Sequence, residues 1–240
     1  MEPKVRTASK ARKPGRPEGP TTSRRDILDV AELLFAELGY AGTALRDVAR
    51  RANVTTAMIG YYFGSKQNLF RAVFLRRGTE VADTRRDALA ALQAAARAPT
   101  VEELVTAFLS PSLRLRETAQ GRAFLRLHSR LHMEPAEISY DLRRNVYDET
   151  TRAYAEAFLR VLPHLDGRAV YLRMSLMIGA YLYTFSDTSR LEELMPGKSA
   201  PTEPLFSLED IVAYVSAGMR AEQPCQADCH PTTPSTSDKT

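Results

Sequence analysis

Cysteine and tryptophan are nearly missing from this chain of 240 residues, which has two cysteines and no tryptophan. Both cysteines, Cys225 and Cys229, lie near the C-terminal end of the sequence, so no disulfide framework can hold a fold together. Such sparse use of cysteine suits a reducing compartment. We therefore expect a cytoplasmic protein.

Long apolar runs are also absent. The longest nearly uncharged apolar stretch, residues 174–185, is well short of the roughly 20 residues that a membrane-spanning helix needs. The basic N-terminal segment has no apolar segment behind it, so it does not have the pattern of a secretory signal. These features predict that no membrane is a partner.

Glycine is scarce, at 12 residues, and no segment alternates apolar and polar residues as a β-strand would. Alanine, leucine, arginine and glutamate dominate, and all four favour helix. The chain is therefore predicted to be all-α, with about nine or ten helices.

The common catalytic motifs are missing: there is no Gly-x-Ser-x-Gly, no Gly-x-Gly-x-x-Gly and no P-loop. His128 and His132 have a spacing that could bind a metal, but a polar edge or part of a ligand pocket is the simpler interpretation. Cys225, Cys229 and His230 lack a fourth ligand. We expect no catalytic residue, no metal, no cofactor and no enzymatic activity.

The charge is unevenly placed. Residues 1–25 carry eight lysines and arginines against two acidic residues, whereas the remainder of the chain is slightly acidic. A basic head indicates an anionic polymer as partner, although a solvated tail without a partner is the alternative. Residues 1–20 are predicted to be a disordered basic arm, and residues 223–240, rich in proline, threonine and serine, a disordered tail.

Residues 21–66 have the pattern of three short helices. The first is predicted to start at Ser23 in a capping box and to end at Gly39. Thr43 is expected to cap the second helix, Thr55 the third and Ser65 the helix that follows, with Asn53 in a left-handed turn between the second and third. This is the spacing of a helix-turn-helix, whose second helix lies in the major groove of DNA.

One side of the predicted third helix is suited to contact DNA. Ile59 and Phe63 share one side and are expected to point into the core, which turns the neighbouring hydroxyl and small side chains toward DNA. Tyrosine, arginine and lysine groups beside them would reach phosphates. The residues predicted to contact DNA in this unit are Thr43, Arg46, Thr55, Thr56, Ala57, Gly60, Tyr61, Tyr62 and Lys66.

Four segments make this pattern specific: residues 34–40 (LFAELGY), 42–49 (GTALRDVA), 52–55 (ANVT) and 61–66 (YYFGSK). In order and spacing, residues 23–70 resemble the DNA-binding domain of the TetR family of bacterial regulators. Three positions depart from the usual pattern: Gly60 replaces a tyrosine, Tyr62 a histidine and Asn53 a glycine.

The basic arm contains Gly15-Arg16-Pro17, which is similar to the core of hooks that enter a narrow minor groove. Its position directly before the helix-turn-helix makes Arg16 a further candidate for DNA contact.

Residues 67–222 continue the helical pattern. A capping box at Thr100 and Glu103 opens a helix that Pro111 is expected to interrupt, and Ser207 with Asp210 opens the last helix. Arg85-Arg86 and Arg143-Arg144 are interpreted as solvated helix faces. Between these elements the pattern predicts helices at about residues 119–134, 135–162 and 167–195, and a last helix ending near residue 222.

The helix predicted over residues 167–195 is apolar nearly all round, so both of its sides must be covered. A symmetric dimer would cover one side, and a buried central helix in a monomer is the alternative. The predicted dimer contacts are Leu172, Leu176, Gly179, Ala180, Tyr183, Val212, Val215 and Met219.

The TetR resemblance implies that this larger C-terminal helical domain binds a small-molecule effector and dimerises. The residues predicted to line the effector pocket are Leu104, Phe108, Phe124, Leu127, His128, Tyr154, Phe158 and Met177.

Together these features predict a sequence-specific transcriptional regulator that associates with the nucleoid when bound to DNA. It would be a homodimeric repressor of a palindromic operator in double-stranded DNA, released by an effector of open chemical class. Two alternatives remain: a helical enzyme with an incidental N-terminal domain, and a nucleoid-type protein that binds DNA without sequence preference.

Overall fold

The computed structural model describes residues 20–186, 194 and 207–223, with side chains from Ser23 onward. All regular structure in these residues is helical, as the sequence predicted. The elements are α1 (Pro20–Gly42), α2 (Leu45–Arg51), α3 (Thr56–Phe63), α4 (Lys66–Gln93), α5 (Val101–Arg114), the 3₁₀ turn η1 (Leu115–Glu117), α6 (Ala119–Leu131), α7 (Ala136–Val161), α8 (Gly167–Phe185) and α10 (Leu208–Arg220). Arg16 of the predicted arm, Cys225, Cys229 and His230 lie outside the described residues.

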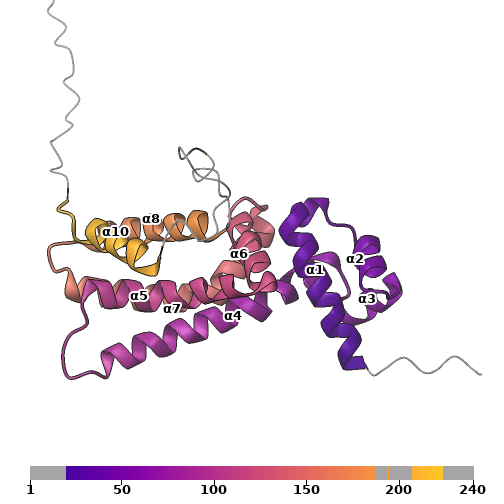
Figure 1. Ribbon diagram of the computed structural model, residues 1–240, viewed down its shortest axis with the longest axis horizontal. Helices are drawn as coiled ribbons and strands as arrows, with labels where there is room; N and C mark the ends of the chain where they lie inside the picture. Colours follow the sequence, from indigo (N-terminus) through magenta and orange to yellow (C-terminus); the bar gives the residue numbers. More distant parts are fainter. Residues whose placement is uncertain (1–19, 187–193, 195–206, 224–240) are drawn as a thin grey trace, which may run out of the picture.

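The described chain is elongated (Figure 1). Helices α1, α2 and α3 form a unit at one end, and the long helix α4 leads away from it along the body. Helices α5 and α7 pack on α4, and α8 and α10 cover the opposite side of this layer. Helix α6 lies between the two regions and packs against α1 as well as α8. None of the helices in the described residues is both long and apolar enough to cross a membrane.

The starts of α3 and α4 follow from hydroxyl caps. Thr55 Oγ1 accepts a hydrogen bond from Met58 N at 3.2 Å, and Ser65 Oγ accepts one from Asn68 N at 3.1 Å. These bonds confirm the predicted caps, which satisfy backbone groups that a helix start leaves unpaired. The turn before α3 places Asn53 at φ 54°, as predicted for a left-handed residue.

Several predicted helix boundaries are wrong. Helix α8 ends at Phe185 rather than at residue 195, and Ser186 N donates back to Tyr183 O at 3.4 Å. Helix α1 begins at Pro20 rather than at Ser23, because proline is already suited to a first helical turn. Helix α5 continues through Pro111 to Arg114. The burial of Leu109, Pro111 and Ser112 offsets the cost of a proline within the helix, about 3 kcal/mol.

Both predicted capping boxes are present. Thr100 and Glu103 exchange hydrogen bonds at the start of α5, and Ser207 and Asp210 do so at the start of α10. Each box satisfies two backbone N–H groups at once, which fixes where the helix begins.

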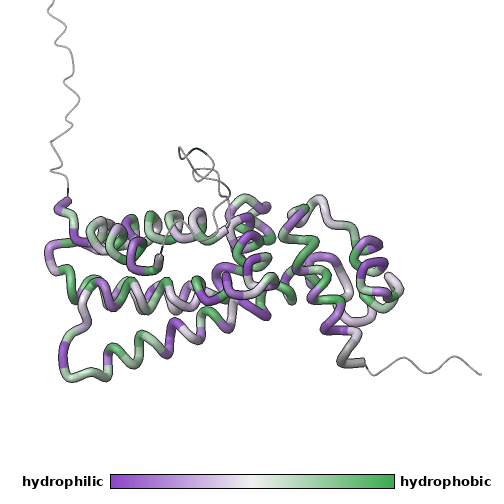
Figure 2. Tube along the Cα trace, in the orientation of Figure 1, coloured by the Kyte–Doolittle hydropathy of each residue, from purple (hydrophilic) through white to green (hydrophobic). Residues whose placement is uncertain are grey.

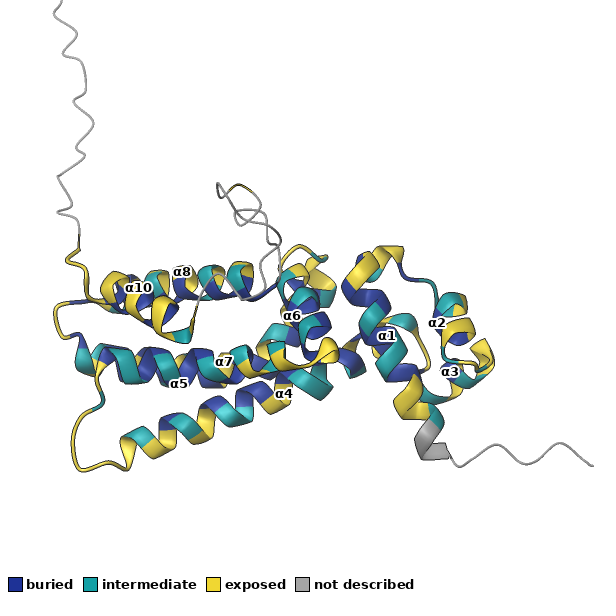
Figure 3. Cartoon of the chain, viewed as in Figure 1, coloured by how far each residue is buried: buried dark blue, intermediate teal, exposed yellow. Residues whose placement is uncertain are grey.

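Two apolar clusters form the core; Figure 3 shows the buried segments of these helices, and Figure 2 shows apolar and polar segments alternating along them. One joins α1, α2 and α3 to the first half of α4, to α6 and to the start of α7. The other joins the second half of α4 to α5, α7, α8 and α10. Gly78 lets α7 approach α4, since a Cβ there would lie 3.0 Å from Val146 Cγ1. Helices α4 and α6 contribute residues to both clusters and so connect the two regions.

A buried carboxylate also ties α1 to α4. Glu32 is completely buried and forms ion pairs with Arg76 and Arg77, and Arg76 also binds Asp29 at 2.6 Å. Burial raises the pKa of Glu32, against the opposing effect of the two guanidinium groups. Breaking such a buried pair leaves an uncompensated charge, so the network fixes the angle at which α1 meets α4.

Candidate nucleic-acid interface and ligand cavity

Helix α3 exposes the face that the sequence assigned to DNA. Ile59 and Phe63 are buried, as predicted, while Tyr61 is 84% exposed. The other residues of this face, which are all exposed, are Thr55, Thr56, Ala57 and Gly60. A Cβ added at Gly60 would meet nothing within 4 Å, so the glycine leaves open space on the outer surface. The helix thus presents a slim, hydroxyl-bearing surface with one projecting aromatic ring.

Tyr62 has a packing role that the sequence left undefined. Its half-buried ring lies edge-on to Tyr61, with centroids 5.3 Å apart, and 6.2 Å from the ring of Phe63. It also packs against the apolar core. Tyr62 therefore supports the ring of Tyr61 from behind, and its phosphate contact stays a prediction.

The structure contradicts the predicted DNA contact of Thr43. The residue is buried, at 1% exposed, and its hydroxyl lies 2.8 Å from Gly39 O and 3.2 Å from Leu34 O. The hydroxyl therefore bonds the end of α1 instead of facing DNA. It is not the cap of α2 either, because Ala44 occupies that position without a side-chain cap. Arg46, in contrast, is exposed on α2.

Lys66 is already engaged within the chain. Its Nζ donates to Ala41 O at 3.3 Å and lies 4.6 Å from the centroid of the Tyr40 ring. Both contacts join the start of α4 to the end of α1. The ammonium group has further N–H donors that a phosphate could accept from, so the phosphate contact of Lys66 stays a prediction.

A cavity of about 740 Å³ lies in the helical body. Its floor is buried and comes from α4, α5, α6, α7 and α8, and its mouth lies along exposed positions of α7 and α8. The lining residues are Arg85, Phe108, His128, Ser129, His132, Tyr140, Arg143, Arg144, Tyr147, Asp148, Thr151, Ser175, Ile178, Gly179, Tyr181, Leu182 and Tyr183. Its volume is in the range of sites for small organic molecules.

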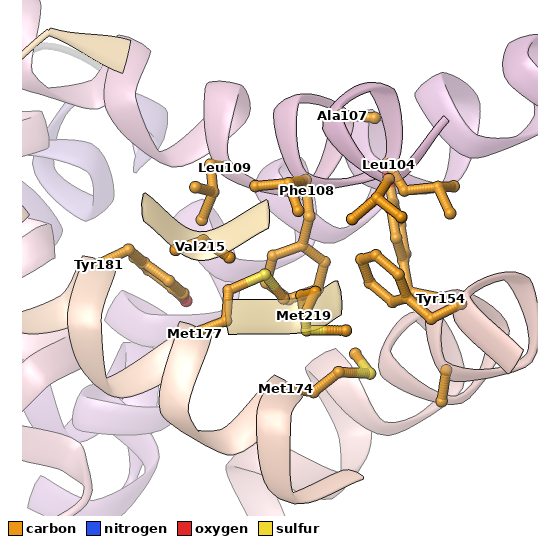
Figure 4. Close-up of a cluster of buried hydrophobic side chains, with 14 of the residues drawn as sticks. Leu104, Ala107, Phe108, Leu109, Tyr154, Met174, Met177, Tyr181, Val215 and Met219 are labelled. Carbon is orange, nitrogen blue, oxygen red and sulfur yellow. The ribbon is translucent and has the colours of Figure 1, made fainter. Parts of the chain in front are cut away.

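Only Phe108 and His128 of the predicted pocket residues line this cavity. The other six are buried in the surrounding core, which corrects the prediction: Leu104, Phe124, Leu127, Tyr154, Phe158 and Met177. Figure 4 shows Leu104, Tyr154 and Met177 as members of one cluster of buried side chains around Phe108. Apolar periodicity identifies buried residues, and it cannot separate those that fill the core from those that border a cavity.

The electrostatics of the cavity are set by burial and by arginine. Burial lowers the pKa of His128 well below its ordinary value, and the neighbouring Arg85 and His132 lower it further. Burial and Arg143 lower the pKa of His132. Both imidazoles are therefore neutral near pH 7. Their rings stack with centroids 6.1 Å apart, and in the described part of the chain no group of three potential metal ligands comes together.

An exposed apolar surface covers α8, with Leu172 60%, Leu176 66% and Tyr183 51% exposed. Gly179 lies on the same side, and a Cβ there would meet nothing within 4 Å. Ala180 is half-buried. On this side, α8 is not covered by the described residues of its own chain.

Three predicted dimer contacts on α10 are corrected. Val212, Val215 and Met219 are 8%, 5% and 1% exposed, because they pack into the chain's own core. Figure 4 shows Val215 and Met219 in this cluster. The outer face of α10 instead carries Tyr214, 75% exposed, with Gly218 opening onto empty space. The side chains of Val212, Val215 and Met219 are therefore not available on the surface of α10.

Comparison with protein families identifies both regions. Residues 27–73 match the model described as bacterial regulatory proteins, tetR family, and residues 106–218 match the tetracyclin repressor-like C-terminal domain. Together the matches cover about two thirds of the chain. The chain belongs to the TetR family. Members of this family are DNA-binding transcriptional regulators.

Two curated TetR-type relatives illustrate how the similarity is distributed. The transcriptional regulator BetI of Paraburkholderia phymatum is 28% identical over 150 residues, which are 62% of this chain and 63% of BetI. The transcriptional repressor AcnR of Corynebacterium glutamicum is 41% identical over 54 residues, 22% of this chain and 29% of AcnR. The chain thus spans less than two thirds of the length of these relatives.

Solved structures of TetR-type regulators share the fold. The regulator PfmR from Thermus thermophilus superimposes with a TM-score of 0.55 at 19% identity, over 82% of this chain and 99% of PfmR. The fatty acid degradation regulator FadR from Bacillus halodurans gives a TM-score of 0.55 at 18% identity, over 85% of this chain and 96% of FadR. At this identity the likeness concerns the fold alone.

The residue of this TetR-family chain that sequence reasoning missed is Arg85. It was interpreted with Arg86 as a solvated face, yet Arg85 is 2% exposed and only Arg86 is exposed. One signal was available, because Arg85 lies four residues after Val81 and four before Leu89, both buried. Positions at this spacing share a helix face, so Arg85 continues the inward stripe of α4.

Proposed function

We propose that this TetR-family chain is a homodimeric repressor that binds a palindromic operator and leaves it when an effector occupies the cavity. The observation that carries the proposal is the exposed face of α3. Thr56, Ala57 and Gly60 leave a slim surface, and Tyr61 projects beside it. Hydroxyl and methyl groups suit base edges in a major groove, and a tyrosine hydroxyl suits a phosphate.

The dimer is proposed to form through α8 and α10. Leu172, Leu176 and Tyr214 give these helices an apolar surface that the described chain leaves uncovered. Large apolar side chains exposed on two neighbouring helices are consistent with an interaction site. Gly179 and Gly218, with open space above both, would let two copies approach closely. A two-fold dimer places two α3 helices on half-sites roughly 34–36 Å apart, or a multiple of that spacing.

The effector response is proposed to pass along α4 and α6. Helix α4 carries Arg85 at the cavity floor and Arg76 in the ion pairs to α1. Helix α6 carries His128 at the floor and packs against α1. A ligand shifts the separation of the two α3 helices only if it binds the two conformers with different affinity.

A gel-shift titration tests the proposal, with the chain's own promoter DNA and a shuffled sequence of equal length. We expect the promoter fragment to be bound preferentially at moderate salt, since base contacts add specificity to the phosphate contacts. Equal binding of both fragments would favour a nucleoid-type protein, and no binding would favour the enzyme alternative.

Removing the basic arm separates these outcomes further. In the proposed function the arm, with Arg16 in the minor groove, only adds affinity, so deleting residues 1–20 weakens binding and flattens its dependence on salt. If binding depended on the basic arm alone, the deletion would abolish it.

A further inference from the structure

Arg85 is a buried cation that has no counter-ion among the described residues. Its side chain lies at the cavity floor and the residue is 2% exposed. Nε donates to Phe108 O at 2.7 Å and Nη2 to Ser112 Oγ at 3.0 Å, and both acceptors are neutral. The guanidinium makes no further hydrogen bond to the described residues, and none of their carboxylates lies within ion-pair distance of it. Burying an unpaired charge is costly, and an anion supplied from outside would remove that cost.

The other charged residues of the cavity lining are also mainly positive. Arg143 and Arg144 stand nearer the mouth, and among the described lining residues only Asp148 is acidic. Within the described chain, none of the three lining arginines forms an ion pair. Three guanidinium groups around a partly water-excluded space create a positive potential that attracts anions.

The walls are aromatic and apolar. The guanidinium carbon of Arg85 lies 3.9 Å from the ring centroid of Phe108 and 5.4 Å from that of Tyr181. Ile178 and Leu182 add aliphatic surface. These rings already hold one cation, so a second, cationic ligand would be repelled. The cavity volume of about 740 Å³ is far larger than an inorganic ion needs, and it fits an organic molecule with an apolar body.

We propose that the effector cavity recognises an organic anion, an acid group on an apolar body, with Arg85 as the residue that binds the acid group. The inference rests on the proposed function for the role of the cavity. A planar guanidinium matches a carboxylate in two parallel hydrogen bonds, which gives orientation as well as affinity. Because Arg85 belongs to α4, the bound anion would act directly on the helix that joins the cavity to α1 and α3.

Two fluorescent probes of nearly the same shape test the inference on the full-length chain. 8-Anilino-1-naphthalenesulfonate carries an acid group, and N-phenyl-1-naphthylamine lacks it. We expect the sulfonate to bind at least about tenfold more tightly, as a charge-assisted hydrogen bond predicts. In a merely apolar cavity the neutral probe binds more tightly, and that result would overturn the inference. Displacement by 2-naphthoate but not by 2-naphthamide extends the test to carboxylates.

Two neighbouring arginines on α4 provide matched variants. Arg85→Met should remove the preference for the sulfonate and keep binding of the neutral probe. Arg86→Met makes the same charge change at an exposed residue paired with Asp83, and it should change neither affinity. Equal losses in both variants would contradict a specific role for Arg85. Should Arg85→Met fail to fold, the wild-type comparison of the two probes still decides.

The same preparation is also titrated with promoter DNA, so that the anion inference and the proposed function can be tested independently. Preferential promoter binding together with tighter binding of the neutral probe would overturn only the anion inference. A strong preference for the sulfonate without any promoter binding would overturn the proposed function and leave an anion site of another purpose.

Discussion

The DNA-binding unit and the helical body place their chemistry on opposite sides of their helices. On α3 the apolar residues Ile59 and Phe63 point inward and leave Thr56 and Tyr61 on the surface. In the body, the most unusual polar group, Arg85, points inward from α4. Surface chemistry on one short helix can be read from local spacing, whereas a cavity is built by five helices that are distant in the sequence.

The largest effect is expected from the proposed dimer contact, because in this account the helical body holds two DNA-binding units together. Leu176→Asp should convert the dimer to a monomer and weaken operator binding by about a hundredfold or more, because burying an unpaired carboxylate costs several kcal/mol. Sedimentation and gel-shift titration measure both effects. Met133→Asp, at a residue 88% exposed outside α8, is the control and should change neither. A Leu176→Asp variant that stays dimeric would exclude this face of α8 as the interface.

The next largest effect is expected on the reading surface itself. Gly60→Ala should weaken operator binding by about tenfold or more if DNA approaches the helix closely, since one lost close contact is worth about 1–3 kcal/mol. Folding should be unharmed, because alanine favours helix by about 1 kcal/mol and no atom lies within 4 Å of the new Cβ.

Gly167→Ala provides the matched control for this substitution. Gly167 has the same open space, but it lies at the start of α8, outside the DNA-binding unit. Unchanged affinity in Gly60→Ala, with both variants folded, would show that DNA does not approach this face.

A smaller effect separates phosphate contacts from base contacts. Tyr61→Phe should weaken binding about fivefold for all DNA sequences, because it removes one hydrogen bond worth about 1 kcal/mol and keeps the ring against Tyr62. Thr56→Ala should instead change the sequence preference. Competition titrations with operator variants distinguish the two patterns. A Tyr61→Phe variant with wild-type affinity would exclude the phosphate contact.

The smallest effect concerns the joint between the regions. Glu134, in the turn between α6 and α7, accepts a hydrogen bond from Tyr40 N at 2.9 Å. Glu134→Ala should lower the free energy of unfolding by about 0.5–1.5 kcal/mol, measured by denaturant titration. Glu149→Ala, at an exposed position of α7, should leave it unchanged. Equal stability of the two variants would mean that this bond does not join the regions energetically.

The sequence predicted the N-terminal unit nearly completely, because its determinants are local. Thr55, Ser65 and Asn53 each dictate the backbone beside them, and the structure places all three as expected. Thr43 is the exception: its hydroxyl bonds carbonyls at the end of α1, a contact that depends on how two helices meet.

In the helical body, the sequence predicted where helices form, but not which side of each helix faces the core, the cavity or the surface. Tyr154 and Met219 show the same apolar pattern as cavity or interface residues would, and both lie in the core. Arg85 sits in a pair of arginines that looks solvated, and it is buried by the packing of α5, α7 and α8 around it. Which side of a helix meets a cavity is decided by its neighbours, so helix periodicity alone cannot assign it.

A nuclease footprint of the full-length chain on its own promoter tests the central claim most directly. A two-fold dimer reading DNA with α3 predicts two protected half-sites related by a dyad, with centres one helical turn or a multiple apart. It also predicts that protection is lost in Leu176→Asp. Uniform protection along the fragment, or a single protected site that persists in that variant, would contradict the account.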